Sequence, residues 1–123
     1  MVVTVYGVPV HLAGVTDQLE AGIKKAACCI LDLRMLPGDV IVFISASITP
    51  EAGLGSGSVV AFVDDFFVPP EMGKEVKTTV GNEIAGTIRS FCETFKAVPK
   101  NGYRVIFRPF DWKVVVEYGV KEE

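Results

Sequence analysis

Two arginines near the carboxyl end of the sequence are the side chains best suited to hold a small anion. Arg104 and Arg108 stand in the segment YRVIFRPF (103–110), whose β-branched and aromatic residues predict a strand. Residues four apart on a strand share a face, so both guanidinium groups should point the same way. A guanidinium can bind a carboxylate through two parallel hydrogen bonds. The alternative is that both arginines pair with acidic residues across a subunit boundary.

Two adjacent carboxylates interrupt the apolar segment 59–68. Asp64 and Asp65 are neighbours, and neighbours on a strand point to opposite faces of a sheet. They therefore cannot work as a paired acid and base. We expect one to bind an arginine and the other to be solvated or to sit at a bulge.

Cysteine and histidine usage predicts neither a disulfide framework nor a metal centre. The three cysteines include an adjacent pair, and no Cys-x-x-Cys spacing occurs. A single histidine, His11, gives no pair of metal ligands at helical spacing. The sequence thus predicts reduced thiols at Cys28, Cys29 and Cys92, no metal and no cofactor.

Length and charge exclude several classes of protein. A chain of 123 residues fits one domain spanning residues 1–123. Its net charge of -3 provides no basic field for nucleic acid or an anionic membrane. No apolar run approaches the roughly 18 residues of a membrane span. The opening MVVTVYGVPV lacks the features of a signal peptide, which predicts a cytoplasmic protein.

The elements that position these residues follow a repeated plan. Apolar spacing predicts one helix from Thr16 or Asp17 to Pro37, with Glu20 completing a capping box, and a second helix over 76–95. Strands are predicted over 2–10, 40–48, 59–68 and 103–110, with a short fifth strand at 114–118. The order is therefore two β-α-β units followed by a short strand.

Two such units predict an α+β fold with a four-stranded mixed sheet. Each unit should pair its two strands in parallel, and both helices should lie on one face. The other face is then uncovered, yet it is apolar, since Ile41 and Phe43 alternate with Val40, Val42 and Ile44. Self-association is the simplest way to cover it.

At this point the sequence resembles the tautomerase superfamily, which includes 4-oxalocrotonate tautomerase and macrophage migration inhibitory factor. The resemblance rests on LPGDVIVFI (36–44), on GLGSGS (53–58) leading into VVAFVDDF (59–66), and on YRVIFRPFDW (103–112). The chain is especially similar to small bacterial members of unassigned activity, through VIFRPF (105–110) and a short strand ending in Tyr-Gly. The resemblance implies a homotrimer that buries the uncovered sheet faces around its three-fold axis.

The same resemblance implies a site at subunit boundaries for a keto or enol carboxylate. Family enzymes use an N-terminal proline as general base, whereas this chain begins Met1-Val2-Val3 and has no proline before Pro9. The α-amine of Met1 would then be the proton carrier of an isomerase. Arg108 and Arg104 lie on the strand that bears substrate-binding groups in the family. Arg34 lies where the family often has a cation, although a helix dipole would equally explain a basic residue there.

Two other functions remain open at this stage. The chain could be a non-catalytic trimer that lost the proline and binds a ligand or a partner protein. It could also be a ferredoxin-like module that binds a small effector, because such modules share the order of strands and helices. A monomer in solution would favour this last alternative.

Overall fold

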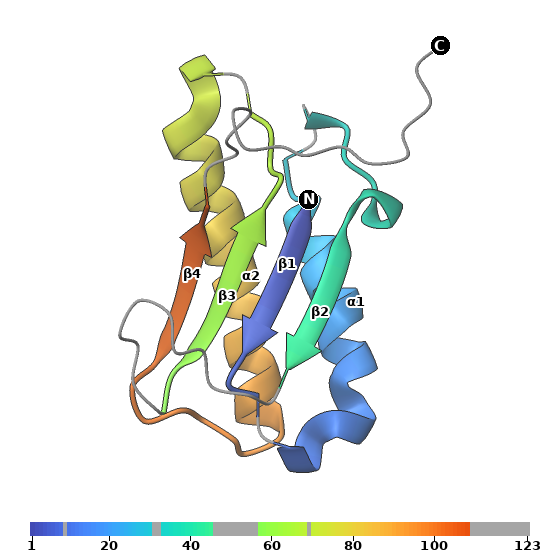
Figure 1. Cartoon of the computed structure of the whole chain (residues 1–123), viewed down its shortest axis with the longest axis vertical. Coiled ribbons are helices and arrows are strands. Elements are labelled where there is room, and N and C mark those ends of the chain that lie inside the picture. Colours follow the sequence, from blue (N-terminus) through green and yellow to red (C-terminus); the bar gives the residue numbers. More distant parts are fainter. Residues whose placement is uncertain (9, 31–32, 46–56, 69, 109–123) are drawn as a thin grey trace, which may run out of the picture.

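The computed structural model describes residues 1–8, 10–30, 33–45, 57–68 and 70–108. Within these residues the chain forms four strands, two α-helices and short 3-10 turns (Figure 1). The strands are β1 (Val2–Tyr6), β2 (Ile41–Ser45), β3 (Val59–Asp64) and β4 (Tyr103–Phe107). The helices are α1 (Thr16–Ala27) and α2 (Gly73–Thr94), and the 3-10 turns are η1 (Val10–Val15), η3 (Pro37–Asp39) and η5 (Pro70–Met72).

The sheet has the strand order β2-β1-β3-β4. β1 runs parallel to β2, with Val2 opposite Ile41, and β3 runs parallel to β4, with Val59 opposite Tyr103. The two halves meet where β1 and β3 pair in antiparallel fashion, with Val2 opposite Asp64. The predicted mixed sheet of two β-α-β units is thus confirmed. The predicted fifth strand lies outside the described residues.

Both helices pack on the same face of the sheet, as predicted (Figure 1). Alternate strand residues such as Val3, Val5 and Ala61 point to this face and are 0% exposed. They pack with the apolar stripes of the helices, where Ile23 and Ile84 are also fully buried. The helix-facing side of the sheet therefore forms the core.

The first helix is shorter than its apolar spacing predicts. α1 ends at Ala27, because Cys28, Cys29 and Ile30 are poorer helix formers than the alanines before them. The predicted cap is also wrong, since Val15 occupies the N-cap position and no side chain caps the helix. Glu20 instead forms an ion pair with Lys24, with 3.1 Å between Oε1 and Nζ.

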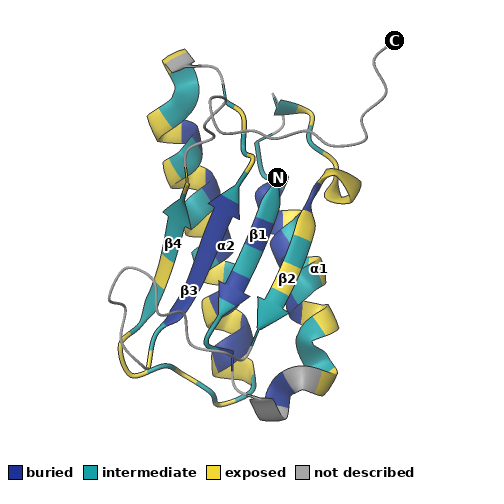
Figure 2. Cartoon of the chain, in the orientation of Figure 1, coloured by how far each residue is buried: buried dark blue, intermediate teal, exposed yellow. Residues whose placement is uncertain are grey.

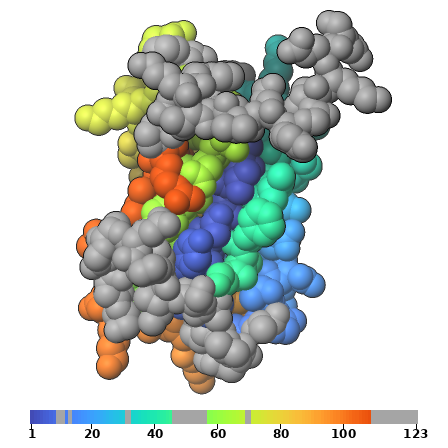
Figure 3. Space-filling model, viewed as in Figure 1, coloured from blue at the N-terminus to red at the C-terminus, as the bar shows by residue number. Residues whose placement is uncertain are grey.

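The opposite side of the sheet carries none of the described helices, and we call it the open face. Its residues follow from the register, which sets Ile41, Val2 and Asp64 in one row and Phe43, Thr4 and Phe62 in the next. Ile41 and Phe43 are 52% and 59% exposed, whereas β3 is buried (Figure 2). Figure 3 shows atoms of the strands on this face. The predicted apolar face is therefore present, and among the described residues its exposed large apolar side chains belong to β2.

The turn after β1 depends on a glycine. Gly7 has a φ of 91°, which side-chain-bearing residues rarely adopt. A Cβ at this position would also collide with the carbonyl oxygen of Ser58, the residue before β3. Gly7 thereby lets the chain leave β1 close to the start of β3.

In the described part of the chain, no helix combines the length and apolar character that crossing a membrane requires.

Candidate functional site

One end of the sheet gathers most of the residues that the sequence singles out. β1 and β2 begin at this end, and β3 and β4 finish there. Arg108 follows β4 and continues its ladder, since its backbone N–H donates to the carbonyl of Val63 over 2.9 Å. We call this the Met1 end of the sheet (Figure 1). It brings together Met1, Arg34 and Arg108.

Arg108 is held on the open face by Asp64. Its Nε and Nη2 donate to the two carboxylate oxygens over 2.7 and 2.5 Å, so the ion pair is bidentate. Its guanidinium carbon also lies 4.4 Å from the centre of the Phe62 ring, which adds a cation–π contact. The pair is accessible, because the side chains of Arg108 and Asp64 are 40% and 28% exposed. The guanidinium thus lies oriented at the surface in a geometry that already binds a carboxylate.

The two aspartates divide as predicted. Asp64 binds an arginine, while Asp65 is exposed and adopts a left-handed backbone conformation with a φ of 54°. This conformation ends β3 and turns the chain away from the sheet. The pairing within one chain also accounts for Arg108 without a subunit boundary.

The α-amine of Met1 lies at the start of β1, the strand next to β3. Its ammonium donates to the backbone carbonyl of Asp39 over 3.3 Å, while its own carbonyl accepts from Ile41 over 3.0 Å. Neighbouring strands lie about 4.8 Å apart, so β1 and β4 are separated by about 10 Å. Asp64 occupies the strand between them. The amine faces β2, whereas Asp64 and Arg108 lie on the other side of β1, at the same end of the sheet.

The two other arginines that the sequence singles out have different surroundings. Arg34 is exposed, has a φ of 51°, and belongs to the connection between α1 and β2, so it reaches the Met1 end. The prediction that it ends the first helix is wrong, because α1 stops at Ala27, and a helix dipole does not explain it. Arg104 is exposed at the opposite end of β4, opposite Val60. Four strand residues span about 13 Å, so Arg104 lies away from the Met1 end.

The cysteines carry no sign of thiol chemistry. All three are free, Cys92 is fully buried in α2, and Cys28 and Cys29 are half-buried after α1. Burial raises the pKa of each thiol above its ordinary value of 9.0. A raised pKa leaves little nucleophilic thiolate at neutral pH.

Phe62 and Asp39 were not singled out from the sequence. The ring of Phe62 lies against the Arg108 guanidinium. It also contacts the ring of Tyr6 edge-on, with 5.9 Å between the ring centres. The sequence did contain a signal for the ion pair between Asp64 and Arg108. It shows an acidic residue at the end of one strand and a basic residue at the end of the strand parallel to it. Asp39 contributes only its backbone carbonyl, for which a sequence gives no signal.

Comparison with known proteins rests on structure. No protein-family model matches the sequence, and no curated protein matches it. A fused 4-oxalocrotonate tautomerase, described as a symmetric trimer, superposes with a TM-score of 0.65 at 12% identity, covering 89% of this chain and 85% of that one. Macrophage migration inhibitory factor from Toxoplasma gondii gives 0.61 at 17% identity and covers 98% of both chains.

A third similar structure is that of a protein inactivated by 2-oxo-3-pentynoate. It has a TM-score of 0.62 and 17% identity, and the match covers 97% of this chain and 93% of that one. The mixed sheet and two helices of this chain match the fold of these structures. Because the sequence identities are low, the comparison shows a shared fold and does not match individual residues. The chain therefore has the fold of the tautomerase superfamily.

Proposed function

We propose that the protein is a homotrimer that binds a keto or enol carboxylate at its subunit boundaries and acts on it as an isomerase. The observation that carries this proposal is that the Met1 amine and the Arg108 guanidinium lie at the same end of the sheet. Arg108 anchors the carboxylate, and Met1 carries the proton. The trimeric description of the fused tautomerase supports assembly, and the 2-oxo acid that inactivates another similar protein supports the substrate class.

Assembly through the open face is supported by its apolar character. Ile41 and Phe43 expose more than half of their surface in one copy of the chain. Adjacent exposed apolar side chains on a sheet favour contact with another protein surface. Copies that meet through this face also bring the Met1 end of one sheet close to another copy. A ligand there would then be enclosed between subunits.

The Arg108–Asp64 pair supports the role of Arg108 as the anchor. Asp64 engages the guanidinium as a substrate carboxylate would, through Nε and Nη2. Partly exposed ion pairs contribute only about 1 kcal/mol, so a substrate carboxylate can exchange with Asp64 at modest cost. Phe62 remains beneath the guanidinium and keeps it oriented during the exchange.

The proton transfer needs only the amine and water. In its neutral form the Met1 amine takes a proton from the carbon next to the substrate carbonyl, and the electron pair moves to the carbonyl oxygen. Water then protonates that oxygen and gives the enol. The reverse sequence returns the keto form, with the ammonium as the acid. Arg34, at the same end, adds positive charge that favours an anionic substrate.

The same ion pair favours a second candidate, a trimer that binds a ligand without turnover. Arg108 is already bound to a carboxylate in its own chain, and the amine donates to the carbonyl of Asp39. Both groups are therefore engaged before any substrate arrives. In this second function the Met1 end recognises a carboxylate, and no proton moves.

The test is an ultraviolet assay of phenylpyruvate enol conversion, combined with binding measurements on three variants. Arg108→Gln should weaken binding about ten- to hundredfold, because a charge-assisted bidentate contact is lost. Asp64→Asn should strengthen binding, since it removes the competing carboxylate, whereas Asp65→Asn should change nothing. If Arg108→Gln binds as well as the wild type, Arg108 is not the anchor.

A second arm separates the isomerase from the binding protein. Acetylation of the Met1 amine should abolish conversion and leave binding in place if the amine carries the proton. Binding with no conversion by the unmodified protein would establish the non-catalytic function. A monomer in light scattering would reject both trimer proposals and favour the effector-binding module.

A further inference from the structure

The helix-facing side of β4 forms the floor of a groove that the fold leaves open. The groove runs between α2, β4 and residues 66–68, and its volume is about 990 Å³. We call it the α2–β4 groove. Its floor consists of Val105, Phe107 and Phe66, with 5.9 Å between the ring centres of the two phenylalanines. Strand residues alternate between faces, so this floor is on the opposite side of β4 from Arg104 and Arg108.

Small residues on α2 keep this groove open. Gly81 and Ala85 are one turn apart on the side of the helix that lines the groove. A Cβ on Gly81 would come within 3.1 Å of Cε2 of Phe107, so a side chain here would press on the phenylalanine ring. Larger residues at these positions would cover the aromatic floor. The volume is at the upper end of the range of about 300 to 1,000 Å³ that is typical of small-molecule sites.

The charge of the groove is positive, although the chain as a whole is acidic. Lys74 and Lys77 line it, and the described lining residues include no carboxylate. Elsewhere on the helices, Lys24 and Arg89 form ion pairs with residues four positions away. Neither groove lysine forms an ion pair with a described residue. Two lysines that form no ion pair within the described part of the chain, beside an apolar floor, favour an anion with an apolar body.

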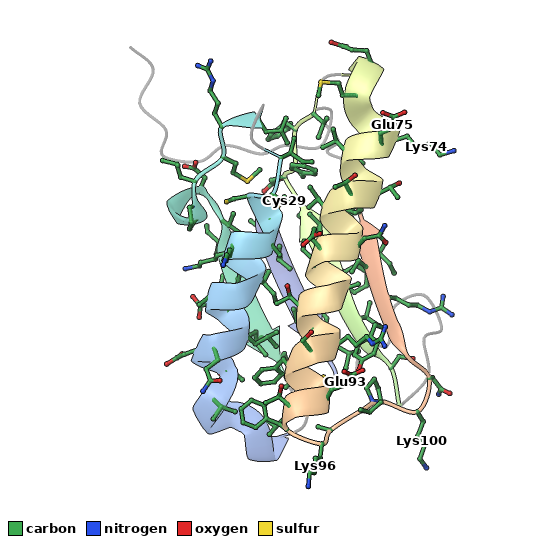
Figure 4. All side chains as sticks on the ribbon, turned by 180° about the vertical axis from the view of Figure 1, so that it is seen from behind. Cys29, Lys74, Glu75, Glu93, Lys96 and Lys100 are labelled. Carbon is green, nitrogen blue, oxygen red and sulfur yellow. The ribbon has the colours of Figure 1, made fainter. Side chains whose placement is uncertain are left out.

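Figure 4 places Lys74 in the first turn of α2, on the side of the helix where β4 lies. The amino end of a helix adds partial positive charge at this point. Asn82 supplies an amide at the rim that can also donate a hydrogen bond to an anion. Phe67 is 60% exposed at the rim, where its ring can stack on a flat ligand. Ammonium groups act as point charges and suit a compact carboxylate.

We propose that the α2–β4 groove binds a small aromatic carboxylate, with Lys74 and Lys77 on the carboxylate and Phe66, Phe67 and Phe107 around the ring. This site is independent of the function proposed above, because the Met1 end of the open face contributes none of these residues. The protein would therefore carry a second ligand site on the helix side of its sheet.

The test titrates the full-length protein with 1-naphthoate and follows backbone amides by nuclear magnetic resonance. The Gly81 amide, on α2 beside the Phe107 ring, should shift on binding. The double variant Lys74→Gln/Lys77→Gln should weaken binding about tenfold, because two accessible ion pairs are lost. The matched control is Lys100→Gln, which removes one charge at the far end of the molecule and should bind as the wild type does (Figure 4).

Three further measurements complete the test. Ala85→Phe should fill the groove and abolish binding, and an unchanged circular dichroism spectrum would show that the variant folds. The neutral amide 1-naphthamide should bind less tightly than the carboxylate. Arg108→Gln should bind 1-naphthoate as the wild type does, which separates this site from the Met1 end. Equal affinity in the double variant and in Lys100→Gln would overturn the proposal, as would shifts confined to the open face or no binding at millimolar naphthoate.

Discussion

Replacing Phe43 with lysine should dissociate the assembly. A phenylalanine side chain can bury about 200 Å². Because Phe43 is 59% exposed in one copy, about 120 Å² of it is available for contact. At about 25 cal/mol per Å², burial of this area contributes about 3 kcal/mol for each copy. Its loss should raise the dissociation constant about a hundredfold, and the added positive charges should raise it further.

The assay is light scattering over a range of protein concentrations, with circular dichroism to check the fold. The matched control is Val98→Lys, which adds the same charge at a residue that is 61% exposed and lies after α2, away from the open face. We expect the wild type and the control to remain associated where Phe43→Lys is a monomer. A folded Phe43→Lys variant with the mass of the wild type at every concentration would refute assembly through this face.

Three other predictions concern stability. Gly7→Ala should lower the free energy of unfolding by about 2 kcal/mol or more in denaturant titration, because of its positive φ and the collision with Ser58; an unchanged midpoint would contradict this. Burial raises the pKa of Cys92 from 9.0, so above that pH the unfolded chain loses a proton that the folded chain keeps, and thermal scans should show stability falling as the pH rises. Burial and the neighbouring Cys92 raise the pKa of Tyr103 from 10.0, and its hydroxyl has no hydrogen-bond partner among the described residues. The melting temperature of Tyr103→Phe should therefore be no lower than that of the wild type, and the variant should lose less stability above pH 10. A clear drop in melting temperature would mean that the hydroxyl makes a hydrogen bond in the folded protein.

The architecture could be predicted from the sequence because each element carries its own period. Ile23 and Ile84 repeat at helical spacing with their neighbours, and Val3 and Val5 alternate along a strand. These periods determine which face is buried, and two β-α-β units leave few ways to arrange the sheet. The end of α1 was missed because the apolar spacing continues into a segment that packs on the core without being helical.

The site was harder to predict because it depends on register. Arg108 meets Asp64 only because β3 and β4 pair with Val59 opposite Tyr103, and a shift of one residue would put them on opposite faces. The α2–β4 groove depends on how closely Gly81 lets the helix approach Phe107. Such distances between elements are set by packing, and no local pattern encodes them.

The central position of β1 has a consequence for how the protein is made. β1 is translated before its partners β2 and β3, which follow only with residues 41–45 and 59–64. Until then VVTVY has two unpaired edges, which makes the nascent chain prone to aggregate. Slowing translation before residue 64 should therefore harm folding, because β1 cannot pair with β3 until residue 64 has been made. Slowing translation after residue 64 should help folding, but by a smaller amount.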